Sequence, residues 1–380
     1  DDFGDDWFLG PLRAWAVDLD QPGLTDFGRR FLRSLAVRDL VRRLDVLRTL
    51  EAHPEINEVV IPPIVYVTGL ERSGTTLLHN LLALHRDARV LRRWELMEPV
   101  PPPSADTYAT DERIAAVQER VDQLRGTPLE RMHWVNADDP EECVWGFVDS
   151  VSMLGQAAAL CMPAWRRFLV EEDLTPAFVN YRRVVRLLLW KHPVAPGGFL
   201  VLKAPQISNH LGRFADAFPE ARFVITDRDP YRCLVSTVAM GASIVAPFCV
   251  ANPLTDDGAR SRIGVANLPH RLTQIATLTT GDPARVLHLG YPELVNASAD
   301  AANRVSDAFA TADDQLGDRV DAFVERQRSG GRAPPPAELP TMGYEPADVW
   351  SDPVVRAYCE RFGIEPERHR LTGQAAEPRP

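Results

Sequence analysis

A glycine loop between an apolar run and a leucine-rich helical pattern is the most informative feature of this sequence. The run Ile64–Val67 is apolar and largely β-branched, which favours a strand, and the loop Gly69–Gly74 follows it. Backbone N–H groups in such a loop point inwards, and the next helix N-terminus adds partial positive charge. The sequence therefore predicts a site for phosphate or a similar oxyanion. The helix is indicated by leucines at helical spacing, Leu77, Leu78, Leu81 and Leu82.

The chemistry of this loop departs from that of nucleoside triphosphatases. The spacing Gly69-x4-Gly74 matches their G-x4-G-K-[ST] loop, but Thr75 stands at the lysine position. Because that lysine contacts the β- and γ-phosphates, its absence disfavours ATP hydrolysis. The cation comes earlier, at Arg72, which suits a ligand with one phosphate at the loop and a transferable group beside it. The residues that follow Arg72 are Ser73, Gly74, Thr75 and Thr76.

A second polar pair follows another apolar run. Phe223–Thr226 has the composition of a strand, Arg228 comes just after it, and Ser236 lies eight residues further on. A guanidinium at a strand end offers a bidentate contact to phosphate. Ser236 is about two helical turns away and can share the same face.

Both motifs resemble those of sulfotransferases that use 3′-phosphoadenosine 5′-phosphosulfate (PAPS). The Arg72–Thr76 segment resembles their 5′-phosphosulfate loop, and Arg228 with Ser236 resembles their second nucleotide signature. The likeness runs from about Thr25 to beyond Tyr291 and is strongest to bacterial sulfotransferases, with tyrosylprotein sulfotransferases more distant. The nucleotide-binding residues that the resemblance implies are Arg72, Ser73, Gly74, Thr75, Thr76, Arg228, Ser236, Tyr291 and Arg328. Supporting segments are Trp94–Leu96, Pro101–Pro103, His133 with Asp138–Glu142, Leu202–Pro205 and Phe218–Phe223.

The resemblance also implies a reaction, the transfer of a sulfuryl group from PAPS to an acceptor hydroxyl. By analogy with phosphoryl transfer, the transition state should be loose and in line, so positioning and charge stabilisation dominate. Side-chain cations can neutralise the leaving phosphate without a metal ion. The resemblance assigns this role to Arg72 and Lys203.

The acceptor needs a general base, and several residues compete for this role. Our first choice is Glu95, which follows the expected short strand 89–94 and precedes a proline-rich turn, although a helix cap or a salt bridge would explain it too. The second choice is His133, since histidine titrates in the useful range. Many relatives carry a histidine where this chain has Ile207, and His210, one turn further, is a possible substitute.

The segment 329–340 reads as a flexible and then stiff connector. In the family, a basic, glycine-containing segment near here folds over the 3′-phosphate, so Arg326, Arg328 and Arg332 are candidates for this contact. An exposed loop before a C-terminal helix explains the same residues.

Apolar runs alternate with helical patterns along most of the chain, which predicts an α/β fold with a parallel, P-loop-type sheet flanked by helices. Ligands then bind at the carboxyl ends of the strands. We expect an N-terminal helical segment (1–60), an α/β domain (61–330) with a helical insertion at about 104–195 on the acceptor side, and a C-terminal extension (331–380). Strands are expected at 64–68, 89–94, 199–202, 222–226 and 285–288, and helices at 25–50, 111–125 and over most of 140–190.

Composition narrows the classes of function. The 380 residues carry a net charge of −11, which disfavours wholesale nucleic-acid binding. The longest apolar stretch, 152–165, is too short to span a bilayer. The first residues are acidic, which is not the composition expected of a signal peptide. Five scattered cysteines argue for packed thiols in a reducing cytoplasm. The arginine-rich face of the 25–50 helix is expected to be solvated, and a homodimer contact or a membrane surface are the alternatives.

We therefore expect a PAPS-dependent sulfotransferase that uses no metal and acts on a small, lipophilic or phenolic acceptor. The tryptophans of the middle region hint at an apolar acceptor, although such residues usually fill a core. Two alternatives stay open. One is a P-loop kinase or triphosphatase with Asp227 on magnesium, and the other is a nucleotide-binding protein without catalytic activity.

Overall fold

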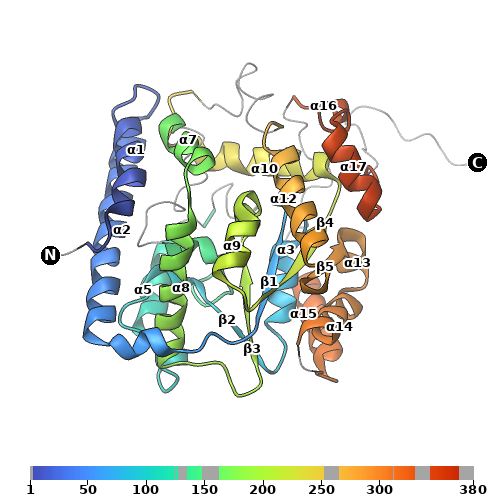
Figure 1. Ribbon diagram of the computed structural model, residues 1–380, viewed down its shortest axis with the longest axis horizontal. Helices are drawn as coiled ribbons and strands as arrows, with labels where there is room; N and C mark the ends of the chain where they lie inside the picture. The colour runs from blue at the N-terminus through green and yellow to red at the C-terminus, as the bar shows by residue number, and fades with distance from the viewer. Residues whose placement is uncertain are drawn as a thin grey trace, which may run out of the picture.

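A five-stranded parallel sheet forms the centre of the computed structural model, which describes residues 3–123, 125–126, 135–147, 162–251, 265–310, 312–329 and 343–367 (Figure 1). The strand order is β2-β3-β1-β4-β5, and every neighbouring pair is parallel. This confirms the predicted α/β class. The strands are β1 (Ile64–Gly69), β2 (Ala88–Val90), β3 (Phe199–Lys203), β4 (Ala221–Asp227) and β5 (Val286–Gly290).

The central strands are apolar on both faces because helices cover both (Figure 1). On β1, Ile64 and Tyr66 point to one face, while Val65 and Val67 point to the other. One face packs against α8 (Thr175–Trp190), α9 (Leu211–Ala217) and α12 (Leu268–Gly281). The other packs against α3 (Thr75–Leu82), α14 (Ser298–Phe309) and α15 (Leu316–Ser329).

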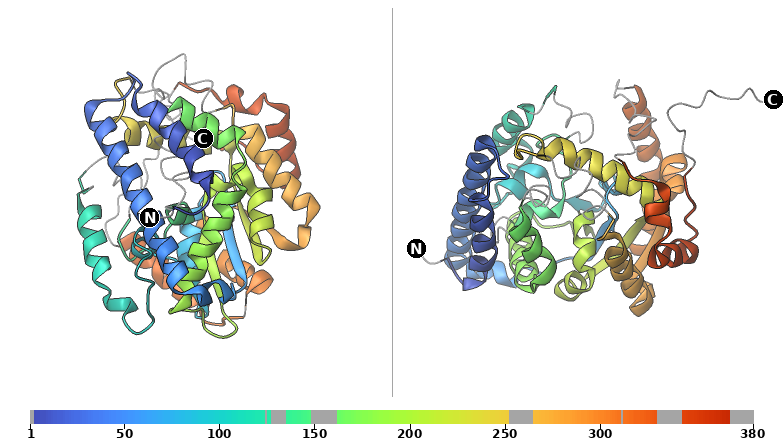
Figure 2. Two further views of the ribbon diagram at one scale, coloured as in Figure 1. Left: turned by 60° about the vertical axis from the view of Figure 1, so that its left-hand side comes forward. Right: turned by 90° about the horizontal axis from the view of Figure 1, so that it is seen from above.

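Two N-terminal helices stand at one side of the sheet domain (Figure 2). They are α1 (Leu9–Leu19) and α2 (Asp26–Ala52), and α1 packs against α7 (Pro163–Glu171). Trp15 and Trp165 meet edge to face, with 5.2 Å between ring centroids. The buried Asp18 carboxylate accepts the backbone N–H groups of Ala164 and Trp165, at 3.1 and 2.7 Å. It therefore satisfies donors that the start of α7 leaves unpaired.

The C-terminal segment is tied to the carboxyl end of β4. The Tyr358 hydroxyl donates to Asp227 at 2.8 Å, and the Tyr231 hydroxyl donates to the carbonyl oxygen of Tyr344 at 2.9 Å. The elements involved are α10 (Pro230–Val245), α16 (Pro346–Trp350) and α17 (Pro353–Phe362). Other helices are α4 (Arg93–Met97), α5 (Glu112–Asp122) and α13 (Tyr291–Asn296), with 3₁₀ turns at Asp6–Phe8, Pro54–Glu58, Tyr108–Thr110, Cys143–Phe147, Pro205–His210 and Pro283–Arg285.

Several predictions differ from the structure in detail. Strand β2 ends at Val90, so Glu95 lies in the short helix α4 and not at a strand end. The acidic segment 138–142 forms turns and a β-bridge between Pro140 and Arg92, and the 3₁₀ turn that begins at Cys143 follows it. Residues 148–161 of the expected helical region lie outside the described residues. Cys249 is disulfide-bonded, so the prediction that every cysteine is a packed thiol is wrong for it. Cys143, Cys233 and Cys359 are buried thiols. The division into three parts stays a prediction.

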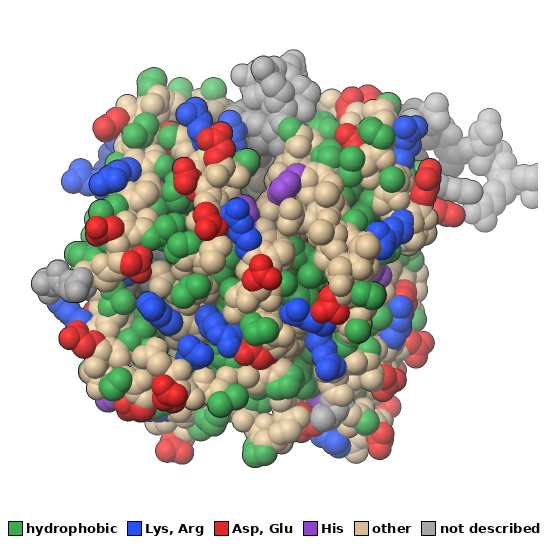
Figure 3. Space-filling model, viewed as in Figure 1, with side chains coloured by type: hydrophobic (Ala, Val, Ile, Leu, Met, Phe, Trp, Pro, Cys, Tyr) green, Lys and Arg blue, Asp and Glu red, His purple; other side chains and the backbone are tan. Residues whose placement is uncertain are grey.

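The surface mixes both signs of charge. On the face shown in Figure 3, acidic and basic side chains are interspersed, with apolar side chains scattered between them. Among the described helices, none is long and apolar enough to cross a membrane.

The end of β1 is packed so tightly that only glycine fits there. Gly69 has φ +144°, and a Cβ atom at this position would lie 2.6 Å from the backbone oxygen of Thr226. We expect Gly69→Ala to lower the free energy of unfolding by at least 1–3 kcal/mol, roughly the cost of one strained backbone position. Urea denaturation measures this loss. Gly281→Ala is the control, because a Cβ there meets nothing within 4 Å. Equal stability of the two variants would contradict the prediction.

Candidate functional site

The glycine loop turns sharply between β1 and α3, at the carboxyl edge of the sheet. Gly74, the N-cap of α3, has φ +100° and ψ 7°. Arg72 also has a positive φ, 69°, which is uncommon for a residue with a side chain. The first N–H groups of α3 have no carbonyl partner within the helix. The predicted anion loop therefore has the backbone shape that such a site requires.

Ser73 anchors the loop with its side chain. It is fully buried, and its hydroxyl donates to the carbonyl oxygen of Leu70 at 2.6 Å while lying 2.5 Å from the Thr226 hydroxyl. This second contact joins the loop to β4. A contribution of Ser73 to a ligand would thus come from its backbone.

Arg72, Arg228 and Ser236 meet at this loop although they are far apart in the sequence. Nε of Arg72 donates to the Ser236 hydroxyl at 3.0 Å, and Nη1 of Arg228 donates to the carbonyl oxygen of Arg72 at 2.8 Å. Burial, and then the nearby Arg228 guanidinium, lower the pKa of Arg72. Two like charges held this close favour an anion between them.

Helix α13 closes one side of the same cluster. The Arg228 guanidinium lies over the Tyr291 ring, 3.9 Å from its centroid. A Cβ atom at Gly74 would lie 3.1 Å from Tyr291 and 2.7 Å from Leu294, so α13 also packs on the loop. This contact brings Tyr291, predicted to bind nucleotide, beside the loop and Arg228.

Lys203 is almost fully buried at the carboxyl end of β3, on the other side of the loop. Its ammonium donates to the Thr76 hydroxyl at 3.3 Å and to Oε1 of Glu142 at 2.7 Å. Oε2 of Glu142 accepts from the amide of Gln206 at 2.8 Å. Burial, and then Lys203, lower the pKa of the neighbouring His79 to about 3, so this imidazole is neutral at pH 7. A lysine and a carboxylate therefore lie together at the start of α3.

Glu95, our first choice for the base, has different neighbours. Its carboxylate is fully buried and accepts from Arg89 at 2.8 Å, from the Tyr108 hydroxyl at 2.6 Å and from the backbone N–H of Arg92 at 2.9 Å. Burial, and then the Glu95 carboxylate, raise the pKa of Tyr108 well above its usual range. Glu95 thus caps α4 and neutralises a buried arginine.

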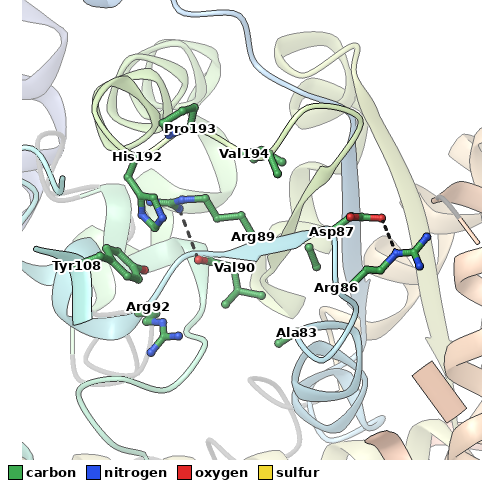
Figure 4. Close-up of a pocket in the computed structure, with 12 residues that line it drawn as sticks. Ala83, Arg86, Asp87, Arg89, Val90, Arg92, Tyr108, His192, Pro193 and Val194 are labelled. Atoms are coloured by element: carbon green, nitrogen blue, oxygen red, sulfur yellow. Dashed lines mark hydrogen bonds and ion pairs between the residues drawn. The ribbon is translucent and has the colours of Figure 1, made fainter. Parts of the chain in front are cut away.

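The partners of Glu95 line a cavity of about 380 Å³ beside the edge strand β2 (Figure 4). Arg89 runs along this cavity towards His192 and Tyr108, whose rings lie 4.0 Å apart. Burial, and then Arg89 and Arg92, lower the pKa of His192 to about 4. None of the described residues lining this cavity comes from the glycine loop or from α10. The structure therefore places Glu95 in a separate polar network, and its role as the base stays a prediction.

The remaining assignments stay predictions as well. His133 and Arg332 lie outside the described residues. Arg328 is exposed near the end of α15 and, within the described ranges, makes no hydrogen bond or ion pair with the loop or with Arg228. His210 is partly buried, and burial followed by Arg213 lowers its pKa to about 4.

Sequence reasoning gave no role at the site to Glu142 or Arg232. Glu142 was noted only within the Asp138–Glu142 segment, and its spacing does not distinguish it from Glu141, which instead forms an ion pair with Arg93. Arg232 lies four residues from both Arg228 and Ser236, and it is one helical turn before Ser236 in α10. That spacing is visible in the sequence and indicates a shared helix face.

Fold and loop together define an α/β protein of the P-loop type with a cluster of cations at the carboxyl edge of its sheet. Residues 63–315, more than half of the chain, match the model of the sulfotransferase family, and the chain therefore belongs to this family. This confirms the resemblance stated above.

Among known relatives, the omega-hydroxy-beta-dihydromenaquinone-9 sulfotransferase Stf3 of Mycobacterium bovis is 22% identical over 240 residues. The match covers 62% of this chain and 60% of the relative, and the Mycobacterium tuberculosis protein of the same name gives the same values. The chain thus matches less than two thirds of the length of these relatives.

Two solved structures share the fold. Sulfotransferase STF9 from Mycobacterium avium superposes with a TM-score of 0.83 at 23% identity, over 95% of this chain and 93% of that one. Sulfotransferase STF1 from Mycobacterium tuberculosis has a TM-score of 0.74 at 22% identity, over 95% and 94%.

The buried network around Glu95 gives a test of its role. Glu95→Gln leaves the Arg89 charge without a carboxylate, and breaking such a pair costs about 3 kcal/mol or more. We therefore expect a clear loss of stability in chemical denaturation. Glu98→Gln is the control, since its partly exposed ion pair with Arg120 is worth less than about 1 kcal/mol. Unchanged stability together with lost turnover would instead favour Glu95 as the base.

Proposed function

We propose that this chain transfers the sulfuryl group of PAPS to a hydroxyl group of a small lipophilic molecule. One observation carries the proposal. The family's phosphate loop has threonine in place of the triphosphatase lysine, and the cations around it come from Arg72, Lys203 and Arg228 on three neighbouring strand ends.

The donor has two anionic ends, and the cluster offers a place for each. Arg228 and Ser236 would hold the 3′-phosphate, since a guanidinium and a hydroxyl both donate to phosphate oxygens. The backbone N–H groups of the loop and of the first turn of α3 would hold the 5′-phosphosulfate. Arg72 contacts Ser236 and accepts from Arg228 through its carbonyl oxygen, so it connects the two ends.

Lys203 and Arg72 would stabilise the charge that develops on the leaving phosphate. An ammonium has three N–H donors, and within the described residues Lys203 uses two of them, on Thr76 and Glu142. The third N–H of the Lys203 ammonium can donate to the phosphosulfate. As the bond from sulfur to the phosphate oxygen breaks, negative charge grows on that oxygen beside a buried cation, where Coulomb attraction is strong.

We assign the general base to Glu142 in preference to Glu95. The acceptor hydroxyl loses its proton as its oxygen forms the new bond to sulfur. Glu142 lies 2.7 Å from the Lys203 ammonium and its side chain is 14% exposed, so its carboxylate is placed to accept the proton. In this proposal Lys203 contacts both the Glu142 carboxylate and the leaving phosphate. Proton uptake and leaving-group stabilisation are thus coupled through one ion pair.

The acceptor class rests on the relatives. The name of the Stf3 proteins specifies a hydroxylated menaquinone derivative, which is an apolar molecule with a hydroxyl group. We extend to this chain only that chemistry, a hydroxyl on a lipophilic body. Action in the cytoplasm, a homodimer and independence from metal ions belong to the same proposal, although the disulfide at Cys249 weighs against a strongly reducing compartment.

A magnesium-dependent kinase or triphosphatase fits the site less well. Asp227, the residue that would hold magnesium, is buried and already accepts hydrogen bonds. Its Oδ2 lies 2.6 Å from Nδ1 of His288, and its Oδ1 accepts the Tyr358 hydroxyl at 2.8 Å. These contacts give Asp227 a structural role in fixing α17. A binding protein without activity stays the second alternative, and turnover decides that question.

The donor assignment predicts ligand-dependent stability. Adenosine 3′,5′-bisphosphate without metal should raise the melting temperature more than ATP with magnesium, because at equal concentration the ligand that binds more tightly stabilises the fold more. Differential scanning fluorimetry at matched ligand concentrations measures both shifts. Adenosine is the control for base stacking alone. A larger shift with ATP and magnesium would overturn the proposal in favour of a triphosphatase or kinase.

The base assignment predicts a specific kinetic defect. Glu142→Gln should lower kcat roughly 10²- to 10⁴-fold, the usual contribution of a general base, and change the affinity for adenosine 3′,5′-bisphosphate little. The assay follows bisphosphate release from PAPS with a panel of lipophilic alcohols and phenols. Glu220→Gln is the control, since that carboxylate pairs with Arg182 just before β4, at the opposite end of the strand. Full activity in Glu142→Gln would move the base elsewhere.

A further inference from the structure

An acidic residue of the C-terminal segment already occupies the arginine cluster. The Glu367 carboxylate accepts from Nε and Nη2 of Arg228 at 2.6 and 3.0 Å, a bidentate pair. Its Oε2 also lies 3.5 Å from Nε of Arg232. The Glu367 side chain is 32% exposed, whereas the two arginines are 14% and 15% exposed. An anion at the surface thus covers two mostly buried cations.

The position of Glu367 is fixed by the residues on either side of Arg228. The backbone N–H of Glu367 donates to Asp229 at 2.8 Å, and the Trp350 indole donates to the same carboxylate at 3.2 Å. Asp227 accepts the Tyr358 hydroxyl. Three consecutive residues, the last of β4 and the two that follow it, therefore bind the C-terminal segment, and Glu367 is directed at the middle one. This arrangement makes the pairing a built contact and not a chance surface pair.

Arg232 shares this anion with Arg228 and lies one turn before Ser236 on the same face of α10. Its Nε is buried and, among the described residues, has no hydrogen-bond partner; its contact with Glu367 is an ion pair at longer range. A buried guanidinium N–H without a hydrogen bond costs free energy that a better-placed acceptor would recover. A phosphate has three acceptor oxygens, whereas the carboxylate of Glu367 has two.

We propose that Arg232 is part of the 3′-phosphate subsite and that Glu367 is an internal competitor which the nucleotide must displace to bind there. This inference rests on the proposed function, since it takes the subsite to be that of a 3′-phosphate. The C-terminal segment then does more than pack on the domain. It sets how tightly the donor binds and how selectively the site takes a nucleotide with a 3′-phosphate.

Charge explains why the exchange works. A phosphate monoester carries about 1.5 to 2 negative charges at pH 7, against one on the carboxylate, so it binds two guanidinium groups more strongly. Without nucleotide, Glu367 neutralises cations that would otherwise repel each other. Each binding event must break the Glu367 pairs, and affinity is reduced accordingly.

Calorimetric titration of four proteins tests this exchange. Wild type, Glu367→Gln, Glu365→Gln and Arg232→Gln are titrated with adenosine 3′,5′-bisphosphate and with adenosine 5′-monophosphate. Glu365 is exposed, lies two residues before Glu367 and serves as the matched control. Glu367→Gln should bind the bisphosphate roughly 5- to 30-fold more tightly, the factor expected when a charged hydrogen-bonded pair no longer has to be broken. Its affinity for the monophosphate should change less than about 2-fold, because that ligand does not use the subsite.

The other variants should separate the two parts of the proposal. Glu365→Gln should match wild type with both ligands, and Arg232→Gln should bind the bisphosphate about 10-fold more weakly with little change for the monophosphate. Circular dichroism and melting temperature confirm that each variant is folded.

Three results would overturn the inference in different ways. If the bisphosphate binds wild type and Glu367→Gln equally well, Glu367 does not compete, while the proposed function stands. If folded wild type and all variants fail to bind the bisphosphate, the proposed function is wrong and the inference falls with it. Equal gains for both nucleotides in Glu367→Gln would show that Glu367 obstructs the pocket in general, which also contradicts competition at a 3′-phosphate subsite.

Discussion

The need to neutralise buried cations at one edge of the sheet governs the whole site. Lys203 ends β3, Arg228 follows β4, and Arg72 follows β1, the strand between those two in the parallel sheet. Parallel strands direct all three to the same edge, where helices exclude water and charge is costly to leave unpaired. Two carboxylates neutralise these cations: Glu142 forms an ion pair with Lys203, and Glu367 forms one with Arg228. In our proposal the phosphate groups of the donor nucleotide neutralise part of this positive charge when the nucleotide binds.

The backbone around these cations is held in a conformation that it would not adopt alone. Arg72 has a positive φ, which is unfavourable for a residue with a side chain, and such strain persists only when the surroundings fix it. Here the fixing contacts come from distant parts of the chain. The Ser73 hydroxyl lies against Thr226 on β4, the Arg72 carbonyl accepts from Arg228, and Tyr291 packs on Gly74. The loop is therefore preorganised by tertiary contacts, which lets its amides point at a ligand without further ordering.

Local pattern was sufficient to predict the fold and the loop, because both depend on neighbours in the sequence. Local composition predicts the strand from the apolar run of β1, the loop from its glycines and the helix from the leucines of α3. All five expected strands are present in the structure. Strand β2 is shorter than predicted because α4 begins at Arg93, where Glu95 caps the helix through the N–H of Arg92. A cap and a catalytic base look alike in a sequence. The difference lies in the partners Arg89 and Tyr108, and only the folded chain shows where these side chains point.

The same limit explains why Glu142 and Glu367 were overlooked. Their importance comes from pairing with residues 61 and 139 positions away, and no local spacing encodes such pairs. Their consequences differ as well. In our proposal Glu142 pairs with a lysine whose charge the leaving phosphate needs, so the pair loosens during the reaction and releases a base. Glu367 pairs with the arginines that would hold a distant phosphate, so its pair must open before any reaction begins. Glu142 is thus placed to act in the chemical step and Glu367 in the binding step. The cation that each carboxylate neutralises determines the step in which it acts.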